Sequence, residues 1–202
     1  MKSRRWSLVL SALGVALLST ASVAAASDSE SARLKKKRDS ERYEVRTPHS
    51  SIKAGAARVH IAAPTASVQK VVLDFKNYDS LSSRFEKSKV VGRDGDKTDV
   101  YLQVPILKGA AKVWAIVRFE PMKKVGNEHV LEGKMIKGNV RRLDATWRIK
   151  SVDENDSQLN LELLIVPKLP VPGSVVTGEV AYAADLAVMG SRNRAEKDAK
   201  KK

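Results

Sequence analysis

From residue 87 onward the chain is a succession of short segments in which apolar and polar residues alternate. A period of two is typical of β-strands that bury one face. The connecting segments are short and rich in Gly, Asp, Asn and Pro, so neighbouring strands should pair antiparallel. Six such strands are expected, over about residues 87–93, 98–104, 110–120, 127–135, 141–150 and 158–166. An earlier alternating run, Arg58–Ala62, adds a seventh strand.

Two helices are expected between the first strand and the other six. Pro64-Thr65 is a good helix start, because proline suits the first turn and threonine can cap it. The residues that follow at helical spacing form one apolar face, made of Val68, Val71, Val72 and Phe75. Tyr78, Leu81 and Phe85 then predict a second short helix.

The segment Pro167–Gly190 predicts a long helix that begins at about Ser174. Its body carries only Glu179 and Asp185 as charged residues, so it needs apolar partners on more than one side. The smaller residues form one stripe, Val176, Val180, Ala183 and Ala187, and the bulkier ones another, Val175, Tyr182, Leu186 and Met189. Space beside the helix is large if the small stripe packs on the sheet, and small if the bulky stripe does.

These elements predict an α+β domain in the order β-α-α-β6-α. A helix this apolar, following a curved antiparallel sheet, most simply lies across its concave face. The expected fold is a seven-stranded curved antiparallel sheet gripping the long C-terminal helix, with two short helices after the first strand.

Three stretches resemble START-like, helix-grip domains: VHIAAPTASVQKVVLDFKNY, LDATWRI and VPKLPVPGSVV. In the first, a strand ends in a small residue and proline, and a helix leads to an Asp-Phe-x-x-Tyr end at Asp74–Tyr78. The pattern is similar to bacterial polyketide cyclase/dehydratase-like and coenzyme Q-binding-like proteins over about residues 57–192. This resemblance implies a sheet that grips the last helix and a cavity for hydrophobic ligands, but no particular activity.

Strand parity and the helix stripes assign the side chains that should line such a cavity. Small inward residues, among them Ala115, Gly133 and Ala145, leave room for a ligand or simply for the gripped helix. The predicted cavity residues are Val100, Leu102, Val104, Val113, Val117, Leu131, Leu143, Trp147, Leu161, Leu163, Val176, Val180, Ala183 and Leu186.

Few polar side chains share this interior. His129, Tyr182 and Glu179 are the weak catalytic candidates, and a lone histidine near a turn is more often structural. We find no phosphate loop, paired-histidine metal spacing or serine nucleophile elbow, and expect neither cofactor nor metal. The leading hypothesis is non-catalytic binding or transport of a lipid, quinone or polyketide-like molecule. A cyclase/dehydratase-type enzyme is the alternative.

The N-terminus predicts an export signal. Lys2, Arg4 and Arg5 precede the apolar run Leu8–Leu18, and small residues lead to a cleavage site near Ala24–Ala26. The expected division is therefore a signal peptide over 1–26, a flexible basic arm over 27–55, the START-like domain over 56–192 and a basic tail over 193–202. We expect a periplasmic or secreted protein.

The formal net charge is +14, which raises the question of an anionic partner, either nucleic acid or a membrane surface. Nucleic acid is disfavoured because the few aromatics are not interleaved with the basic runs. An anionic membrane surface could attract the run Lys35, Lys36, Lys37 and Arg38. By parity, the residues Tyr101, Trp114, Ile116 and Val130 face outward. One hypothesis is an exposed patch by which, together with the basic arm, an envelope interaction module docks. The alternatives are that the arm packs over these residues or that a bulge near Trp114 reverses the parity there.

Overall fold

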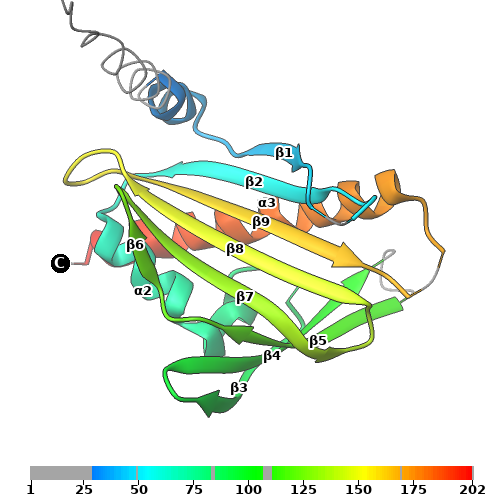
Figure 1. Ribbon diagram of the computed structural model, residues 1–202. Helices are drawn as coiled ribbons and strands as arrows, with labels where there is room; N and C mark the ends of the chain where they lie inside the picture. The colour runs from blue at the N-terminus through cyan, green and yellow to red at the C-terminus, as the bar shows by residue number, and fades with distance from the viewer. Residues whose placement is uncertain (1–28, 49, 83–84, 107–110, 169, 202) are drawn as a thin grey trace, which may run out of the picture.

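The computed structural model describes residues 29–48, 50–82, 85–106, 111–168 and 170–201. Within them, nine strands form one antiparallel sheet in the order β1-β2-β9-β8-β7-β5-β4-β3, and β6 pairs with β7 (Figure 1). The strands are β1 Glu41–Val45, β2 Ala54–Ile61, β3 Lys87–Asp94, β4 Lys97–Ile106, β5 Ala111–Phe119, β6 Lys123–Val125, β7 Glu128–Gly138, β8 Arg142–Ser151 and β9 Ser157–Val166.

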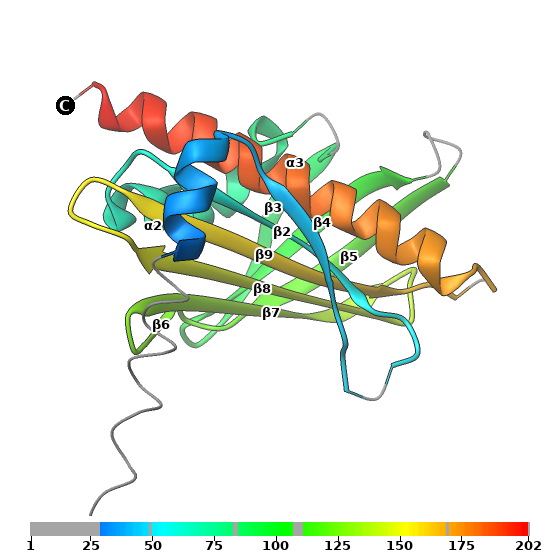
Figure 2. The same cartoon turned by 90° about the horizontal axis from the view of Figure 1, so that it is seen from above.

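The helices follow the predicted order. α2 covers Thr65–Leu73 with Val68, Val71 and Val72 buried, and a 3₁₀ helix, η1, covers Phe75–Ser80. The long helix α3 covers Gly173–Ala199 and lies along one face of the curved sheet (Figures 1 and 2). The α+β fold of a curved antiparallel sheet gripping a C-terminal helix is thus confirmed, with β1 and β6 as strands that the sequence pattern did not predict.

The small side of α3 packs against the sheet. Its buried residues include Thr177, Val180, Ala181, Ala184, Ala187 and Val188. Val175 and Tyr182 of the bulky stripe are exposed by 46% and 36%. Contact with β2 is close: a Cβ atom on Gly55 would lie 2.2 Å from the backbone nitrogen of Ala181. Small residues on both partners therefore let the helix sit low on the strand.

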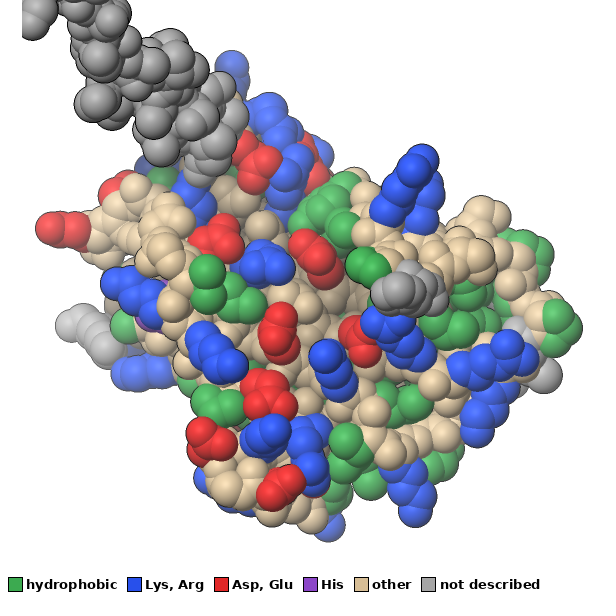
Figure 3. All heavy atoms as spheres, viewed as in Figure 1, with side chains coloured by type: hydrophobic (Ala, Val, Ile, Leu, Met, Phe, Trp, Pro, Cys, Tyr) green, Lys and Arg blue, Asp and Glu red, His purple; other side chains and the backbone are tan. Residues whose placement is uncertain are grey.

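Strand β8 shows the predicted parity in full. Leu143, Ala145, Trp147 and Ile149 are buried, and the residues between them are half-buried. On the outer face, acidic and basic side chains are interspersed (Figure 3). Arg148 lies 3.9 Å from both Glu128 and Glu162 there. Ion pairs at such solvent-accessible positions contribute little to stability, so they mainly keep this face polar.

The described part of the predicted arm, residues 29–48 and 50–55, is structured, although its composition indicated a flexible segment. Residues 29–37 are helical, and β1 pairs antiparallel with β2 from Glu41 opposite Arg58 to Val45 opposite Ala54. Leu34 is fully buried, Ser31 Oγ donates a hydrogen bond to Gln158 Oε1 at 3.0 Å, and Lys35 pairs with Asp156. The free edge of β2 supplies backbone partners that composition alone does not reveal.

The expected basic tail is also shorter than residues 193–202, because α3 continues to Ala199 and Ala195 is fully buried. Over the described residues, the helices are too short or too polar to span a membrane.

Candidate functional site

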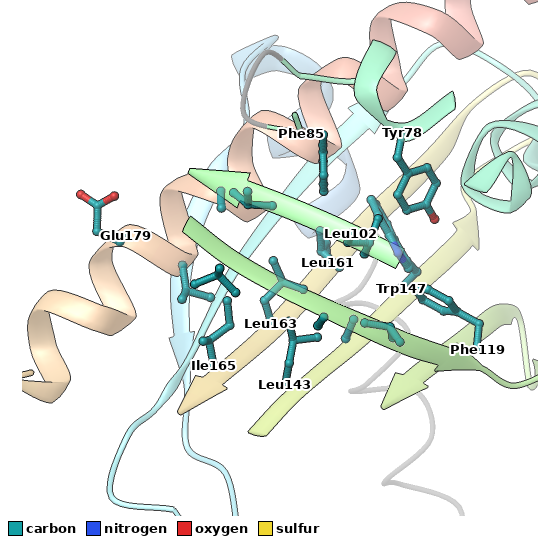
Figure 4. A pocket seen from close by; sticks show the side chains of 17 residues that line it. Tyr78, Phe85, Leu102, Phe119, Leu143, Trp147, Leu161, Leu163, Ile165 and Glu179 are labelled. Carbon is teal, nitrogen blue, oxygen red and sulfur yellow. The ribbon is translucent and has the colours of Figure 1, made fainter. Parts of the chain in front are cut away.

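An apolar cavity lies between the sheet and the first half of α3 (Figure 4). Its volume is about 100 Å³. Each layer of the fold contributes to it: η1 and the segment after it, strands β4, β5, β8 and β9, and α3. The lining residues are Tyr78, Phe85, Leu102, Val104, Val113, Ala115, Val117, Phe119, Leu143, Ala145, Trp147, Leu161, Leu163, Ile165, Glu179, Val180 and Ala183.

Burial gives the cavity a closed and an open end. Phe119 and Trp147 are 2% exposed and Leu161 is 1% exposed, so the wall is sealed there. Leu163 and Ile165, further along β9, are only half-buried. The open end therefore lies towards the first turns of α3, where that helix carries Glu179.

The structure brings together most of the residues that the pattern predicted. Ten of them line the cavity: Leu102, Val104, Val113, Val117, Leu143, Trp147, Leu161, Leu163, Val180 and Ala183. Four others, Val100, Leu131, Val176 and Leu186, do not line it. Val100 and Leu131 are buried in the core instead, whereas Val176 and Leu186 are half-buried on α3. Parity identified the correct face of each strand, but it could not say where along that face the core closes.

Several cavity residues were not predicted as such. Ala115, Ala145 and Ile165 share the inward parity of their predicted neighbours and could have been included on that signal. Tyr78 and Phe85 come from the segment that follows α2, and Phe119 closes the inner end of β5. Their approach to the cavity depends on how η1 folds back over the sheet, which has no local signal.

Aromatic side chains close the inner end of the cavity. Phe75 stacks on Phe119 with ring centroids 4.7 Å apart, and Tyr78 meets Trp147 edge-on at 6.2 Å. The Tyr78 hydroxyl donates a hydrogen bond to the Val72 carbonyl at 2.5 Å. Burial raises the pKa of Tyr78 far above its ordinary value, so the phenol stays protonated and acts as a hydrogen-bond donor to the backbone.

The three polar candidates do not converge on this space. Glu179 is exposed, and its carboxylate points away from the cavity (Figure 4). The guanidinium carbon of Arg42 lies over the Tyr182 ring, 5.8 Å from the ring centroid, on the side of α3 that faces β1. His129 pairs in register with Lys124 and Ile149 and does not line the cavity. The arrangement can enclose an apolar group, but it presents no acid/base pair to it.

The predicted outer patch is only partly assembled. Tyr101 stacks on Trp114 at 6.1 Å and lies opposite Ile116, and all three are half-buried. Val130 is 8% exposed because β6 pairs across it at Lys123. A bulge follows Ile116, which lies opposite Lys137 while Val117 lies opposite Met135. Val130 therefore does not belong to an exposed surface with the other three.

Solved structures with this architecture come from several bacteria. A START superfamily protein from Mycobacterium smegmatis has a TM-score of 0.61 at 19% identity, covering 70% of this chain and 96% of its own. A STAR-related lipid transfer protein from Xanthomonas axonopodis has a TM-score of 0.65 at 13% identity, covering 77% and 93%. An aromatase/cyclase from a Streptomyces species has a TM-score of 0.52 at 16% identity, covering 72% and 92%.

At these identities the likeness is one of fold. None of the curated proteins compared with this chain matches it. The family model described as polyketide cyclase/dehydrase and lipid transport matches residues 61–182, from the end of β2 into α3. That span contains nearly every residue of the cavity wall. The chain therefore belongs to the polyketide cyclase/dehydrase and lipid transport family and has the START-like helix-grip fold.

Proposed function

We propose that this protein binds and carries an apolar small molecule in the cavity under α3, without transforming it. The observation that carries the proposal is the chemistry of the wall. Apart from Glu179, Tyr78 and the indole N–H of Trp147, its side chains are apolar; the Glu179 carboxylate points away from the cavity, and the Tyr78 hydroxyl donates to the Val72 carbonyl. Such a wall favours a hydrocarbon chain or ring by excluding water from it. The Xanthomonas protein of similar fold is a STAR-related lipid transfer protein, which supports the proposal.

The size of the cavity limits how a ligand can enter. About 100 Å³ is well below the roughly 300–1,000 Å³ that encloses a drug-sized molecule. The wall must therefore move when a lipid, a quinone or a polyketide-like ring binds. Gly55 lies opposite Leu163 in the sheet and holds α3 close to β2 there, whereas the side chains of Leu163 and Ile165 are only half-buried. We therefore expect these side chains, and not α3, to move when a ligand enters.

Absence of catalysis is part of the proposal. Acid/base chemistry needs a titratable group within hydrogen-bond reach of the reacting atom. His129 and Tyr182 are not cavity-lining residues, and the carboxylate of Glu179 points away from the cavity. The cyclase alternative predicts turnover that depends on one of these residues, so substitution of each in turn, followed by a product assay, distinguishes the two functions.

The place of action is proposed from the N-terminal pattern alone. We infer export to the periplasm or medium, with cleavage near Ala24–Ala26 and attraction of Lys35–Arg38 to anionic membrane. Cell fractionation and N-terminal sequencing of the purified protein test the export. An unprocessed protein that stays in the cytoplasm would contradict it.

Trp147 provides a direct readout for ligand binding, because its indole lies in the cavity wall. Substitution of Trp6 and Trp114 by Phe leaves Trp147 as the sole tryptophan. Titration with a fluorescent or native fatty acid should shift its emission, and native mass spectrometry should detect the bound lipid. Repeated recovery of empty protein, with no change in Trp147 emission across lipids, quinones and aromatic polyketides, would refute the proposal.

Neighbouring positions on β8 offer a matched pair of variants. Ala145 faces the cavity, and Thr146 is the next residue, on the outer face of the same strand. Ala145→Leu adds apolar volume where the ligand would lie and should weaken binding about tenfold or more. Thr146→Leu adds a comparable side chain outside and should leave binding unchanged. Equal effects of the two substitutions would place the ligand elsewhere.

A further inference from the structure

A second hollow lies beside the other half of α3, and three distant segments of the chain form it. The end of the N-terminal helix contributes Lys35 and Arg38, and the end of β2 contributes His60 and Ala62. The last turns of α3 contribute Arg192, Glu196 and Lys200. Its volume is about 400 Å³. Figure 2 shows the N-terminal helix lying beside this part of α3. We call this hollow the basic pocket.

Positive charge dominates the basic pocket. Four of its seven lining residues are Lys or Arg, and one is Glu. Lys35 pairs with Asp156, and Arg192 Nε lies 3.5 Å from Glu196 Oε1. The side chains of Arg38 and Lys200 form no ion pair with another described residue. Two cationic groups therefore face the hollow without a carboxylate partner.

The pocket is held in place by backbone contacts. Arg192 Nη1 donates a hydrogen bond to the Arg38 carbonyl at 2.9 Å, and the Ala62 backbone N–H donates one to Glu196 Oε1 at 3.0 Å. Arg38 itself ends the N-terminal helix with a φ of 57°. These contacts join the three segments and fix Arg192 and the backbone of Arg38, so the outline of the pocket exists before any ligand arrives. A preformed site costs less to use in binding.

Buried polar atoms line the back of the pocket. The side chain of His60 is 10% exposed, and its Nε2 lies 3.3 Å from Asp156 Oδ1 without a well-aligned hydrogen bond. Arg192 Nε is buried and also lacks a hydrogen bond. Cations at the end of a helix are often explained by its dipole alone. Lys35 and Arg38 also lie at the C-terminal end of a helix, so the dipoles account for the sign of the charge at each helix end but not for the meeting of the two ends around one hollow.

We propose that the basic pocket binds a phosphate group, either as a free phosphomonoester or as the head group of an anionic phospholipid. Arg guanidinium and Lys ammonium groups around one hollow are the usual partners of phosphate oxygens. The site is separate from the apolar cavity, because it uses residues of α3 from Arg192 onward whereas the cavity uses Glu179, Val180 and Ala183. It does not depend on what the cavity binds.

The test compares two double variants that lose the same charge. Arg38→Gln with Lys200→Gln removes the two unpaired cations of the pocket. Lys124→Gln with Lys197→Gln removes two exposed cations, one on β6 and one on α3, at positions outside both the pocket and the run Lys35–Arg38. Calorimetric titration with glycerol 3-phosphate at fixed ionic strength, and sedimentation with phosphatidylcholine vesicles with and without phosphatidylglycerol, measure the two sources of phosphate.

Binding of either source should fall about tenfold or more in the pocket variant and remain near the wild-type value in the matched variant. Loss of glycerol 3-phosphate binding identifies a soluble ligand, and loss of vesicle binding alone identifies a lipid head group. Equal loss in both double variants would show unspecific charge attraction and overturn the proposal. Absence of binding to both sources by the wild-type protein would overturn it as well.

Discussion

A Cβ atom on Gly190 would lie 1.7 Å from the carbonyl oxygen of Leu81, so only glycine lets α3 touch the backbone that follows η1. This contact lies beyond the cavity along the helix. Together with the contact between Gly55 and Ala181, it holds α3 at two points against different layers of the fold.

Gly190→Ala should destabilise the protein by roughly 1–3 kcal/mol, because backbone on both sides must move apart. Gly178 is the control in the same helix, since a Cβ there meets nothing within 4 Å. Gly178→Ala should stabilise the protein by about 0.5–1 kcal/mol through helix propensity. Urea unfolding measures both. Equal changes in the free energy of unfolding for the two substitutions would mean that the backbone at Leu81 can move aside at no cost.

Tyr78→Phe should lower stability by about 1–3 kcal/mol, because it leaves the buried Val72 carbonyl without its hydrogen-bond donor. Tyr101→Phe is the matched control, since the Tyr101 hydroxyl donates to Gln103 Oε1 at a half-buried position, and its loss should cost less. Thermal unfolding compares them. If Tyr78→Phe is neutral in stability but abolishes ligand binding, the hydroxyl serves the ligand and not the fold.

Asp99→Asn should cost about 1–2 kcal/mol, because Arg118 donates two hydrogen bonds of 2.8 Å to that carboxylate. Asp94 also pairs with Arg118 but is 61% exposed, so Asp94→Asn should have little effect. The Arg118 hydrogen bonds lower the pKa of Asp99 below 3.8. Its stabilising contribution is present above that value and is lost as the pH falls through the folded-state pKa. Chemical denaturation at several pH values reads out both effects.

His60 should make the protein less stable in mild acid. Burial, and secondarily the nearby charge of Lys35, lower its pKa from 6.5, although Asp156 acts in the opposite direction. Below pH 6.5 the unfolded chain takes up a proton on His60 that the folded protein binds less readily. The free energy of unfolding therefore decreases as the pH is lowered.

The melting temperature should therefore drop more between about pH 7.5 and about pH 5 in the wild type than in His60→Gln. His129→Gln controls for the loss of a histidine elsewhere in the sheet. A wild type and a His60→Gln variant with parallel pH profiles would contradict the prediction.

Periodicity was sufficient for the strands β3 to β5 and β7 to β9, for α2 and for the position of α3, because each depends on residues close in sequence. The inward faces of β8 and β5 followed from parity alone, and ten cavity residues followed from those faces. These elements, together with the resemblance between VHIAAPTASVQKVVLDFKNY and helix-grip domains, predicted the correct fold.

Contacts between distant segments decided the rest. Residues 41–45 look polar and unstructured until the edge of β2 pairs with them, and Val130 looks exposed until β6 covers it. Gly55 and Gly190 determine how low α3 lies, and hence how much space remains under it. The two basic runs, expected as solvated tails, meet around His60 only because the N-terminal helix packs on α3. Packing across the chain is a property of surfaces that no local pattern encodes, so the cavity volume and the basic pocket became visible only in three dimensions.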